Sequence, residues 1–291
     1  MTDEPAALDH RCYRHPDREA YIACQRCGRS ICPDCMRDAA VGFQCPSCVQ
    51  EGAKSVRAPT TLAGGAVPVR EGIASMVLIG LNVAAFVLTL LLGGTSGRLT
   101  QLGAMITSSG LFRDGSDLVA VTGVADGAYW RMLTSAFLHS GALHLLFNMY
   151  ALYLFGPMIE RVLGVRRFVA VYVTMAVGAS VFIYWLASPN SFTVGASGAV
   201  FGLFALALVL LLKAGQDVRF LLIMLALNAV ISLQGNISWQ GHLGGFLTGL
   251  VIGVAIAYAP RERRQLVQIV VFAVIWIAII VATAVRTLSL T

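Results

Sequence analysis

Residues 239–258 read WQGHLGGFLTGLVIGVAIAY, a stretch without a charged side chain. A helix needs about 20 apolar residues to cross the hydrocarbon core of a bilayer, since each residue adds about 1.5 Å. Glycines recur at every fourth position and form a smooth stripe along one face: Gly241, Gly245, Gly249 and Gly253. Small residues at this spacing let two helix backbones approach closely in lipid. The stretch therefore predicts a membrane-spanning helix that packs tightly against a neighbour.

Apolar segments of this kind recur along most of the chain. Of its 291 residues, 57% are hydrophobic and 12% are charged, and the mean hydropathy is +0.75. A soluble domain of this length could not bury so much apolar surface, so we expect an all-α polytopic membrane protein. The predicted segments are 73–92, 141–159, 167–187, 197–212, 218–234, 239–258 and 266–286. The fourth is short, which indicates a helix that begins below the membrane surface.

The basic residues predict how these segments are oriented. Cytoplasmic loops of membrane proteins are enriched in Lys and Arg. Alternate loops of this chain hold them: Arg161, Arg166 and Arg167, then Lys213 and Arg219, then Arg261, Arg263 and Arg264. The loops 188–192 and 235–238 hold none, and Met1–Asp9 lacks the apolar stretch of a signal peptide. We therefore expect a multi-pass protein of the cell membrane with a cytoplasmic amino terminus and the long loop 93–140 outside. The net charge of +6 is then an orientation signal, and no nucleic-acid partner is expected.

Polar residues inside a membrane helix are costly, so they mark functional candidates. The predicted topology puts His144, Asn148, Ser197 and His242 at one depth, near the outer surface. A serine hydroxyl becomes nucleophilic when a histidine accepts its proton. The amide of Asn148, the ring of His144 and the backbone N–H of Ser197 could then stabilise an oxyanion. Because Glu160 lies at the opposite end of its helix, we expect a Ser–His dyad without a carboxylate.

These residues also have structural interpretations. Serine is common where membrane helices pack, and polar pairs such as His144 and Asn148 join helices by hydrogen bonds. Intramembrane histidines also relay protons in transporters. A transporter would carry charged residues at mid-membrane and internal repeats, and the sequence contains neither. The convergence of the polar residues at one depth favours catalysis.

Several sequence elements resemble, in the same order, those of the rhomboid family of intramembrane serine proteases. They are Trp130-Arg131, His144-xxx-Asn148, Gly195-Ala196-Ser197-Gly198 and His242 within its glycine stripe. The resemblance covers residues 73–258 and implies a six-helix core, to which residues 259–291 add a seventh helix.

The resemblance also implies a role for each matched residue. Ser197 would be the nucleophile and His242 the base, while His144, Asn148 and the Ser197 amide would form the oxyanion hole. Phe201 would pack against the ring of His242. Trp130 and Arg131 would brace the first loop.

The implied activity is that of a serine endopeptidase that needs no cofactor for catalysis. Its substrates would be single-span membrane proteins, cut within or near the transmembrane segment beside a small residue. The alternative is a catalytically silent relative that binds membrane proteins for quality control. Such a relative would lack the serine or the histidine, and this chain contains both.

The first 50 residues hold all the cysteines, in pairs of metal-ligand spacing. The pairs are Cys12-xx-His15, Cys24-xx-Cys27, Cys32-xx-Cys35 and Cys45-xx-Cys48. Two-residue spacing lets both side chains reach one ion, and Zn²⁺ takes four such ligands. The pairs therefore predict two structural zinc ions in residues 1–50. A cytoplasmic location would keep the thiols reduced.

The order of the pairs leaves the ligand assignment open. We prefer an interleaved arrangement, in which Cys12, His15, Cys32 and Cys35 hold one ion and Cys24, Cys27, Cys45 and Cys48 hold the other. Sequential pairing remains possible, and His10 could replace His15. The pattern resembles a B-box or related cross-braced zinc finger, which implies a protein-binding or regulatory module. Residues 51–72, rich in Gly, Ala, Pro and Thr, predict a flexible linker.

Overall fold

The computed structural model describes residues 10–55, 59–68, 70–114, 117–232 and 237–290. The chain divides into two compact units, Met1–Pro59 and Thr60–Thr291, here called the head and the membrane unit. The predictions that concern Met1–Asp9, and those for the first half of the loop 235–238, lie outside the described residues.

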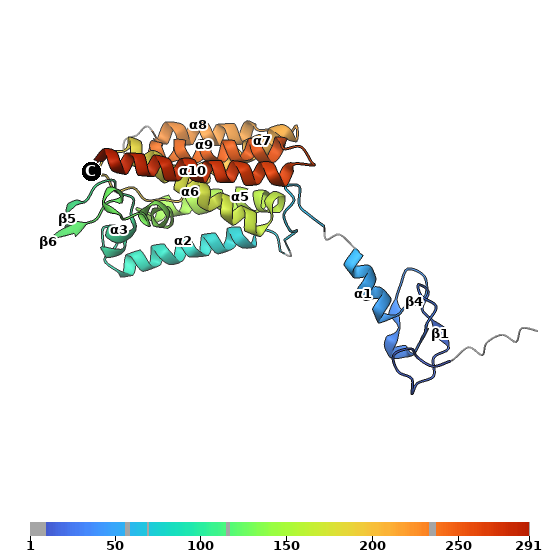
Figure 1. Ribbon diagram of the computed structural model, residues 1–291. Coiled ribbons are helices and arrows are strands. Elements are labelled where there is room, and N and C mark those ends of the chain that lie inside the picture. Colours follow the sequence, from blue (N-terminus) through green and yellow to red (C-terminus); the bar gives the residue numbers. More distant parts are fainter. Residues whose placement is uncertain (1–9, 56–58, 69, 115–116, 233–236, 291) are drawn as a thin grey trace, which may run out of the picture. The chain divides into compact units, whose positions relative to one another are not determined.

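The membrane unit consists of long helices that run along a common direction (Figure 1). They are α2 (Ile73–Leu91), α5 (Ala142–Leu163), α6 (Val165–Leu186), α7 (Ser197–Lys213), α8 (Arg219–Ser232), α9 (Trp239–Tyr258) and α10 (Arg264–Leu290). Each coincides with a predicted apolar segment, so the all-α polytopic class is confirmed. Five of them are long and apolar enough to cross a membrane, whereas α7 and α8 are shorter apolar helices.

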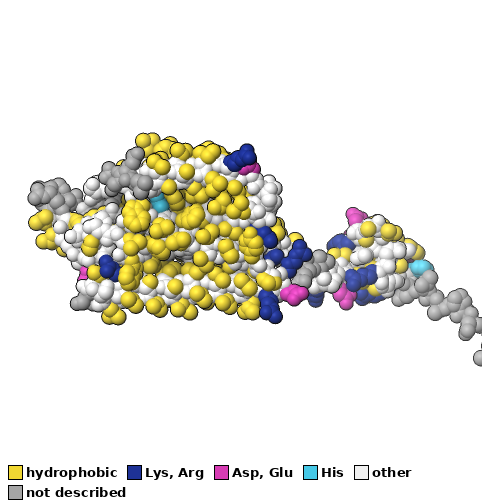
Figure 2. Space-filling model, turned by 90° about the horizontal axis from the view of Figure 1, so that it is seen from above, with side chains coloured by type: hydrophobic (Ala, Val, Ile, Leu, Met, Phe, Trp, Pro, Cys, Tyr) yellow, Lys and Arg dark blue, Asp and Glu magenta, His cyan; other side chains and the backbone are white. Residues whose placement is uncertain are grey.

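The surface of the membrane unit agrees with this class. Hydrophobic side chains cover the flank that Figure 2 presents, and most of the Lys and Arg residues on this face gather at one end. Exposed apolar residues on this scale are suited to contact with lipid. The chain is therefore a multi-pass membrane protein.

The helix α7 lies at the centre of the membrane unit, in contact with α5, α6 and α9. Most of its side chains are buried. The glycine stripe of α9 faces it: a Cβ atom added to Gly245 would collide with the carbonyl of Gly198, and one added to Gly249 would collide with that of Gly202. Only glycine fits at these positions, so the predicted close approach of the sixth segment to a neighbour is confirmed.

A buried carboxylate joins α2 to α5. Glu160 of α5 is 0% exposed. It accepts hydrogen bonds from the backbone N–H groups of Ala74 (3.1 Å) and Ser75 (3.0 Å), and from Ser75 Oγ (2.9 Å). These N–H groups belong to the first turn of α2, which has no intrahelical acceptor for them. The negative charge also complements the positive end of the helix dipole.

The long loop between α2 and α5 is structured. It contains α3 (Arg98–Gly103), the hairpin of β5 (Gly110–Asp114) and β6 (Asp117–Val121), η2 (Val124–Asp126), α4 (Arg131–Thr134) and η3 (Ser135–Phe137). Arg131 is buried and donates to the carbonyls of Ala104 (2.8 Å) and Gln101 (2.7 Å). Trp130 Nε1 donates to the carbonyl of Leu102 (3.0 Å). Trp130 and Arg131 thus hold α3 against α4, which confirms the expected brace.

Parts of the predicted flexible linker have a defined structure. Its first residues continue the helix α1 (Pro46–Ser55) of the head. Within the membrane unit, Ala63 is buried, and its carbonyl accepts hydrogen bonds from Arg167 and from Gln268 (3.2 Å). Composition alone could not foresee this, because the acceptor is a backbone group and its partners lie more than 100 residues away.

The head is small and its regular structure is sparse. Strand β1 (Ile22–Ala23) pairs with β2 (Ser30–Ile31), and β3 (Arg37–Asp38) pairs with β4 (Phe43–Gln44), with η1 (Pro33–Cys35) between the two hairpins and α1 after them. Its core consists mainly of cysteines: Cys12, Cys24, Cys32, Cys35, Cys45 and Cys48 are buried with Ala20 and Ile31. Such a core contains little apolar surface.

Candidate functional site

The loop that enters α7 places Ser197 beside a glycine that no other residue could replace. Gly195 has a φ of +135°, a value that side chains disfavour. A Cβ atom on it would lie 2.7 Å from His144 Cε1, 2.8 Å from His144 Nε2 and 3.6 Å from Ser197 Oγ. The imidazole of His144 and the hydroxyl of Ser197 therefore both lie next to the backbone of Gly195.

The α5 side of this point consists of His144 and Asn148, one turn apart. Asn148 is buried, and its amide donates to the carbonyl of His144 at 2.9 Å, which leaves its second N–H available. The Nδ1 atom of His144 lies 3.0 Å from Oγ of the exposed Ser140, so Nε2 is the nitrogen directed to Gly195. If the hydroxyl of Ser140 donates to Nδ1, that nitrogen carries no proton of its own. A neutral His144 is then protonated on Nε2, which becomes a hydrogen-bond donor.

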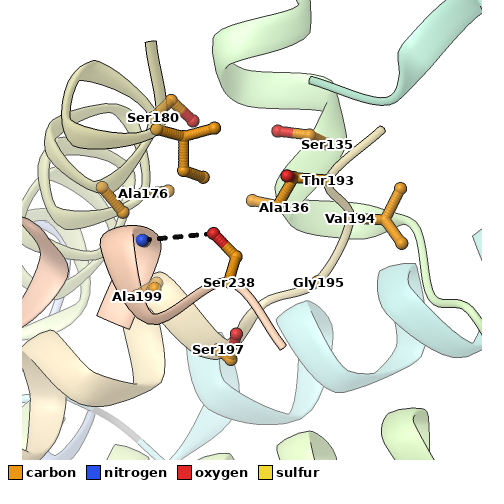
Figure 3. A pocket seen from close by; sticks show the side chains of 14 residues that line it. Ser135, Ala136, Ala176, Ser180, Thr193, Val194, Gly195, Ser197, Ala199 and Ser238 are labelled. Carbon is orange, nitrogen blue, oxygen red and sulfur yellow. Dashed lines mark hydrogen bonds between the residues drawn. The ribbon is translucent and has the colours of Figure 1, made fainter. Parts of the chain in front are cut away.

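The α9 side holds His242, which is 8% exposed. Its ring stacks on Phe201 of α7, with centroids 4.0 Å apart and planes inclined by 9°. The expected packing of Phe201 on this ring is thus confirmed. Phe201 lies one turn beyond Ser197, so α7 presents the hydroxyl and the stacking partner of the imidazole on successive turns. The helix α9 begins just before His242, where Ser238 Oγ accepts a hydrogen bond from the Gly241 N–H (3.3 Å; Figure 3).

A small pocket lies next to Ser197 (Figure 3). Alanine, glycine and hydroxyl-bearing residues make up most of its lining, including Ser135, Ala176, Ser180 and Thr193. The hydroxyl of Ser180 is occupied, because it donates to the carbonyl of Met132 at 2.7 Å. The pocket is therefore narrow, weakly polar and shaped for a small group.

The residue Ser232, which the sequence analysis did not single out, also contacts the site. Its hydroxyl lies 2.6 Å from Nδ1 of His242. The signal available in the sequence was its position at the end of the fifth apolar segment, at the depth predicted for His242. His139, in the loop before α5, is also buried, and its ring centroid lies 5.1 Å from that of His144.

The head brings its cysteines and His15 together in two groups of four. One consists of Cys12, His15, Cys32 and Cys35, and the other of Cys24, Cys27, Cys45 and Cys48; within each group the ligand atoms all lie within 4.8 Å of one another. This is the interleaved arrangement, and His10 belongs to neither group.

The distances within the groups suit a tetrahedral ion. His15 Nδ1 lies 3.3 Å from Cys32 Sγ, 3.4 Å from Cys35 Sγ and 3.8 Å from Cys12 Sγ. A zinc ion with Zn–S of about 2.3 Å and Zn–N of about 2.0 Å needs ligands about 3.5–3.8 Å apart. Burial raises the pKa of the Cys35 thiol to about 11, and the neighbouring Cys12 and Cys32 add to the rise. A metal would therefore have to displace a proton from this group when it binds.

The all-cysteine group has a cation beside it. Arg29 Nε lies 3.3 Å from Cys27 Sγ and its Nη2 lies 3.8 Å from Cys45 Sγ. The guanidinium also lies over the ring of Tyr13, 4.3 Å from its centroid. Four thiolates around a divalent ion leave two negative charges, and Arg29 is placed to offset part of them.

Comparison with known proteins assigns the membrane unit to a family. The model of the rhomboid domain matches residues 126–259. The rhomboid-family protein YdcA of Bacillus subtilis (strain 168) is 36% identical over 148 residues, which cover 49% of this chain and 74% of that protein.

Two further relatives have names that state an activity. The rhomboid protease AarA of Providencia stuartii is 29% identical over 167 residues, which cover 47% of this chain and 59% of that protein. The rhomboid protease GluP of Bacillus subtilis (strain 168) is 35% identical over 141 residues, which cover 46% of this chain but 27% of that protein. The range that the family model matches contains Trp130, His144, Asn148, Ser197 and His242. On these matches, and on a helical membrane unit with this arrangement of polar residues, the chain belongs to the rhomboid family.

Proposed function

We propose that this chain is an intramembrane serine endopeptidase in which Ser197 is the nucleophile and His242 the base. The observation that carries the proposal is the placement of polar residues from α5 and α7 at one strained glycine, with His242 of α9 packed on the next turn of α7. His144 and Ser197 both lie against Gly195, and His242 stacks one turn further along α7. The names of the related proteases support the same reaction class.

In the proposed reaction, Ser197 Oγ attacks the carbonyl carbon of the scissile peptide while Nε2 of His242 takes its proton. The resulting oxyanion accepts hydrogen bonds from the backbone N–H of Ser197, the free N–H of Asn148 and Nε2–H of His144. His242 then gives its proton to the leaving amine, and the peptide bond breaks. A water molecule repeats the sequence on the acyl-enzyme and restores Ser197.

The substrates we propose are single-span membrane proteins that present a small residue to the pocket beside Ser197. Its lining of alanine, glycine and serine leaves room for a small side chain only. The distribution of Lys and Arg supports a cytoplasmic head and an active site near the extracytoplasmic face.

The test is covalent labelling of the purified full-length protein by a fluorophosphonate probe. We expect the wild type to be labelled, and the variants Ser197→Ala and His242→Ala to lose labelling while their melting temperatures stay close to that of the wild type. Equal labelling of wild type and Ser197→Ala would overturn the proposal and leave a silent, substrate-binding relative as the better description.

For the head we propose two structural zinc ions in the two groups of four ligands. The support is the ligand chemistry and the tetrahedral spacing of the ligand atoms. A module of this kind would bind a protein partner. Metal analysis of the purified protein tests the proposal, and a content of about two zinc ions per chain is expected.

A further inference from the structure

The proposed base has a hydrogen-bond partner on a different helix. Nδ1 of His242, on α9, lies 2.6 Å from Oγ of Ser232, at the end of α8. Both residues are buried, with 8% of His242 and 5% of Ser232 exposed. In a buried pair, water is a poor substitute for either partner, so the bond matters to both.

The hydrogen-bond count of Ser232 determines the direction of this bond. A serine hydroxyl has one proton to donate. Ser232 Oγ also lies 2.6 Å from the carbonyl oxygen of Asn228, which can only accept. The serine proton therefore goes to Asn228, and the bond to His242 must use a proton on Nδ1. A neutral His242 is then protonated on Nδ1 and unprotonated on Nε2.

The stacking of Phe201 alone cannot fix the orientation and tautomer of the His242 ring. Parallel rings with centroids 4.0 Å apart fix the plane of the imidazole but allow the ring to flip about its Cβ–Cγ bond, which would exchange the positions of Nδ1 and Cδ2. The bond to Ser232 selects the orientation in which Nδ1 faces α8. The two contacts together hold the ring in one orientation and one tautomer.

We infer that Ser232 is a positioning residue that selects the tautomer of His242 able to accept the proton of Ser197. This inference rests on the proposed function of Ser197 and His242. A carboxylate occupies the equivalent place in a Ser–His–Asp triad, where it holds the imidazole in the correct tautomer. Here a neutral hydroxyl, itself held by the backbone of α8, takes that place. The bond persists when His242 is protonated, because Nδ1–H remains its donor.

The kinetic experiment measures inactivation of the full-length protein by a fluorophosphonate over a range of probe concentrations. For Ser232→Ala we expect the limiting rate of inactivation to fall about 10- to 100-fold, by analogy with the loss seen when the orienting partner of a metal-bound histidine is removed. The probe concentration for half-maximal rate should not change, since Ser232 touches no substrate. Ser232→Thr keeps the hydroxyl and should restore most of the rate.

A matched control is Thr89→Val on α2. Thr89 Oγ1 donates to the carbonyl of Ala85, four residues earlier, as Ser232 does to that of Asn228. The control removes a buried hydroxyl of the same geometry and should leave the inactivation rate unchanged. If Ser232→Ala reacts as fast as the wild type, the inference is wrong, although the proposed function survives as long as Ser197→Ala is unlabelled.

The decisive measurement is the tautomer itself. The ¹⁵N chemical shifts of ¹⁵N-histidine protein, assigned by comparison with His242→Gln, should show neutral His242 protonated on Nδ1 in the wild type. In Ser232→Ala a mixture of the two tautomers is expected. A wild-type His242 protonated on Nε2, or an unchanged tautomer in Ser232→Ala, would overturn the inference whatever the rates.

Discussion

The head and the membrane unit face the same physical problem and solve it by different means. Neither can rely on the hydrophobic effect. The head is too small to bury much apolar surface, and its core consists mainly of cysteines. The membrane unit buries many apolar residues, but the lipid around it is as apolar as its core. The head gathers metal ligands instead, and the membrane unit brings backbones into contact.

This difference decides which substitutions each region tolerates. The ligands of the head would act together through the two proposed metal ions, so that loss of the ions should remove most of its stability. The membrane unit depends on shape, at positions such as Gly245 and Gly249, and on a few buried polar bonds, such as those of Glu160. Substitutions in the membrane unit should therefore cause losses of stability that are local and that vary in size with the contact removed. The following experiments test that contrast, from the largest expected effect to the smallest.

Removal of metal should unfold the head and spare the membrane unit. Structural zinc sites contribute about 10–16 kcal/mol of binding free energy at neutral pH, and that energy is the folding energy of a small domain. We expect a strong chelator to make residues 10–55 susceptible to proteolysis while fluorophosphonate labelling continues. Lower pH should have the same effect, because protons compete for the thiolates. Proteolysis that is unchanged after complete loss of metal would contradict this account.

The substitution Gly245→Ala should disrupt the contact between α7 and α9. The added methyl would collide with the carbonyl of Gly198, a backbone atom that cannot move aside. Overpacking of this kind costs about 1–3 kcal/mol and more where the obstacle is rigid. The loss of stability is measured as the difference in the free energy of unfolding between Gly245→Ala and the wild type in detergent.

The control for that experiment is Gly80→Ala on α2, where a Cβ would meet nothing within 4 Å. Replacing a helical glycine without a clash should leave stability unchanged or raise it by about 0.5–1 kcal/mol. Equal destabilisation by the two substitutions would show that close backbone approach is not what holds α7 and α9 together.

The substitution Gly195→Ala should affect activity more than stability. Its methyl would displace the ring of His144, which lies 2.7 Å from the Cβ position. Loss of one oxyanion donor lowers kcat by about 10²- to 10³-fold. Gly127→Ala is the matched control, since Gly127 also has a positive φ (+98°) but open space around its Cβ position. It should lose a little stability and keep its labelling rate. Similar labelling of both variants would remove His144 from the proposed oxyanion hole.

The smallest effect should come from neutralising a carboxylate. Glu160→Gln keeps the shape but loses the charge that three donors share, and we expect a loss of about 1–3 kcal/mol of unfolding free energy. Glu71→Gln removes the charge of an exposed carboxylate, 2.5 Å from Arg161, and should cost no more than about 1 kcal/mol. The two are compared by thermal unfolding in the same detergent. A larger loss for Glu71→Gln would reverse the expected order.

The sequence allowed prediction of features with a local pattern. Length and hydropathy located the helices, two-residue spacing located the two groups of candidate metal ligands, and the four-residue repeat of glycines located the face of α9. Gly195 and Ser197 could be recognised because their motif is contiguous. Each of these predictions depends on residues close together in the chain.

Features that join distant segments were not predicted. The bond between Ser232 and His242 depends on the rotation of α8 about its own axis, which no periodicity in residues 218–234 specifies. Glu160 was placed correctly at the far end of α5. Its partners, Ala74 and Ser75, could not be predicted, because the sequence around them has no pattern that indicates a bond to a distant carboxylate. The ordered contacts of Ala63 use a backbone carbonyl, which every residue has.

The bond network of Glu160 also has a consequence for biosynthesis. The first turn of α2 and its capping carboxylate are separated by 85 residues. At a synthesis rate of about 5–20 residues per second, α2 would exist for about 4–17 s before Glu160 is made. During that interval its leading N–H groups need another partner, such as water or lipid head groups. Temporary partners must therefore satisfy these groups during synthesis, until α5 brings Glu160 to replace them.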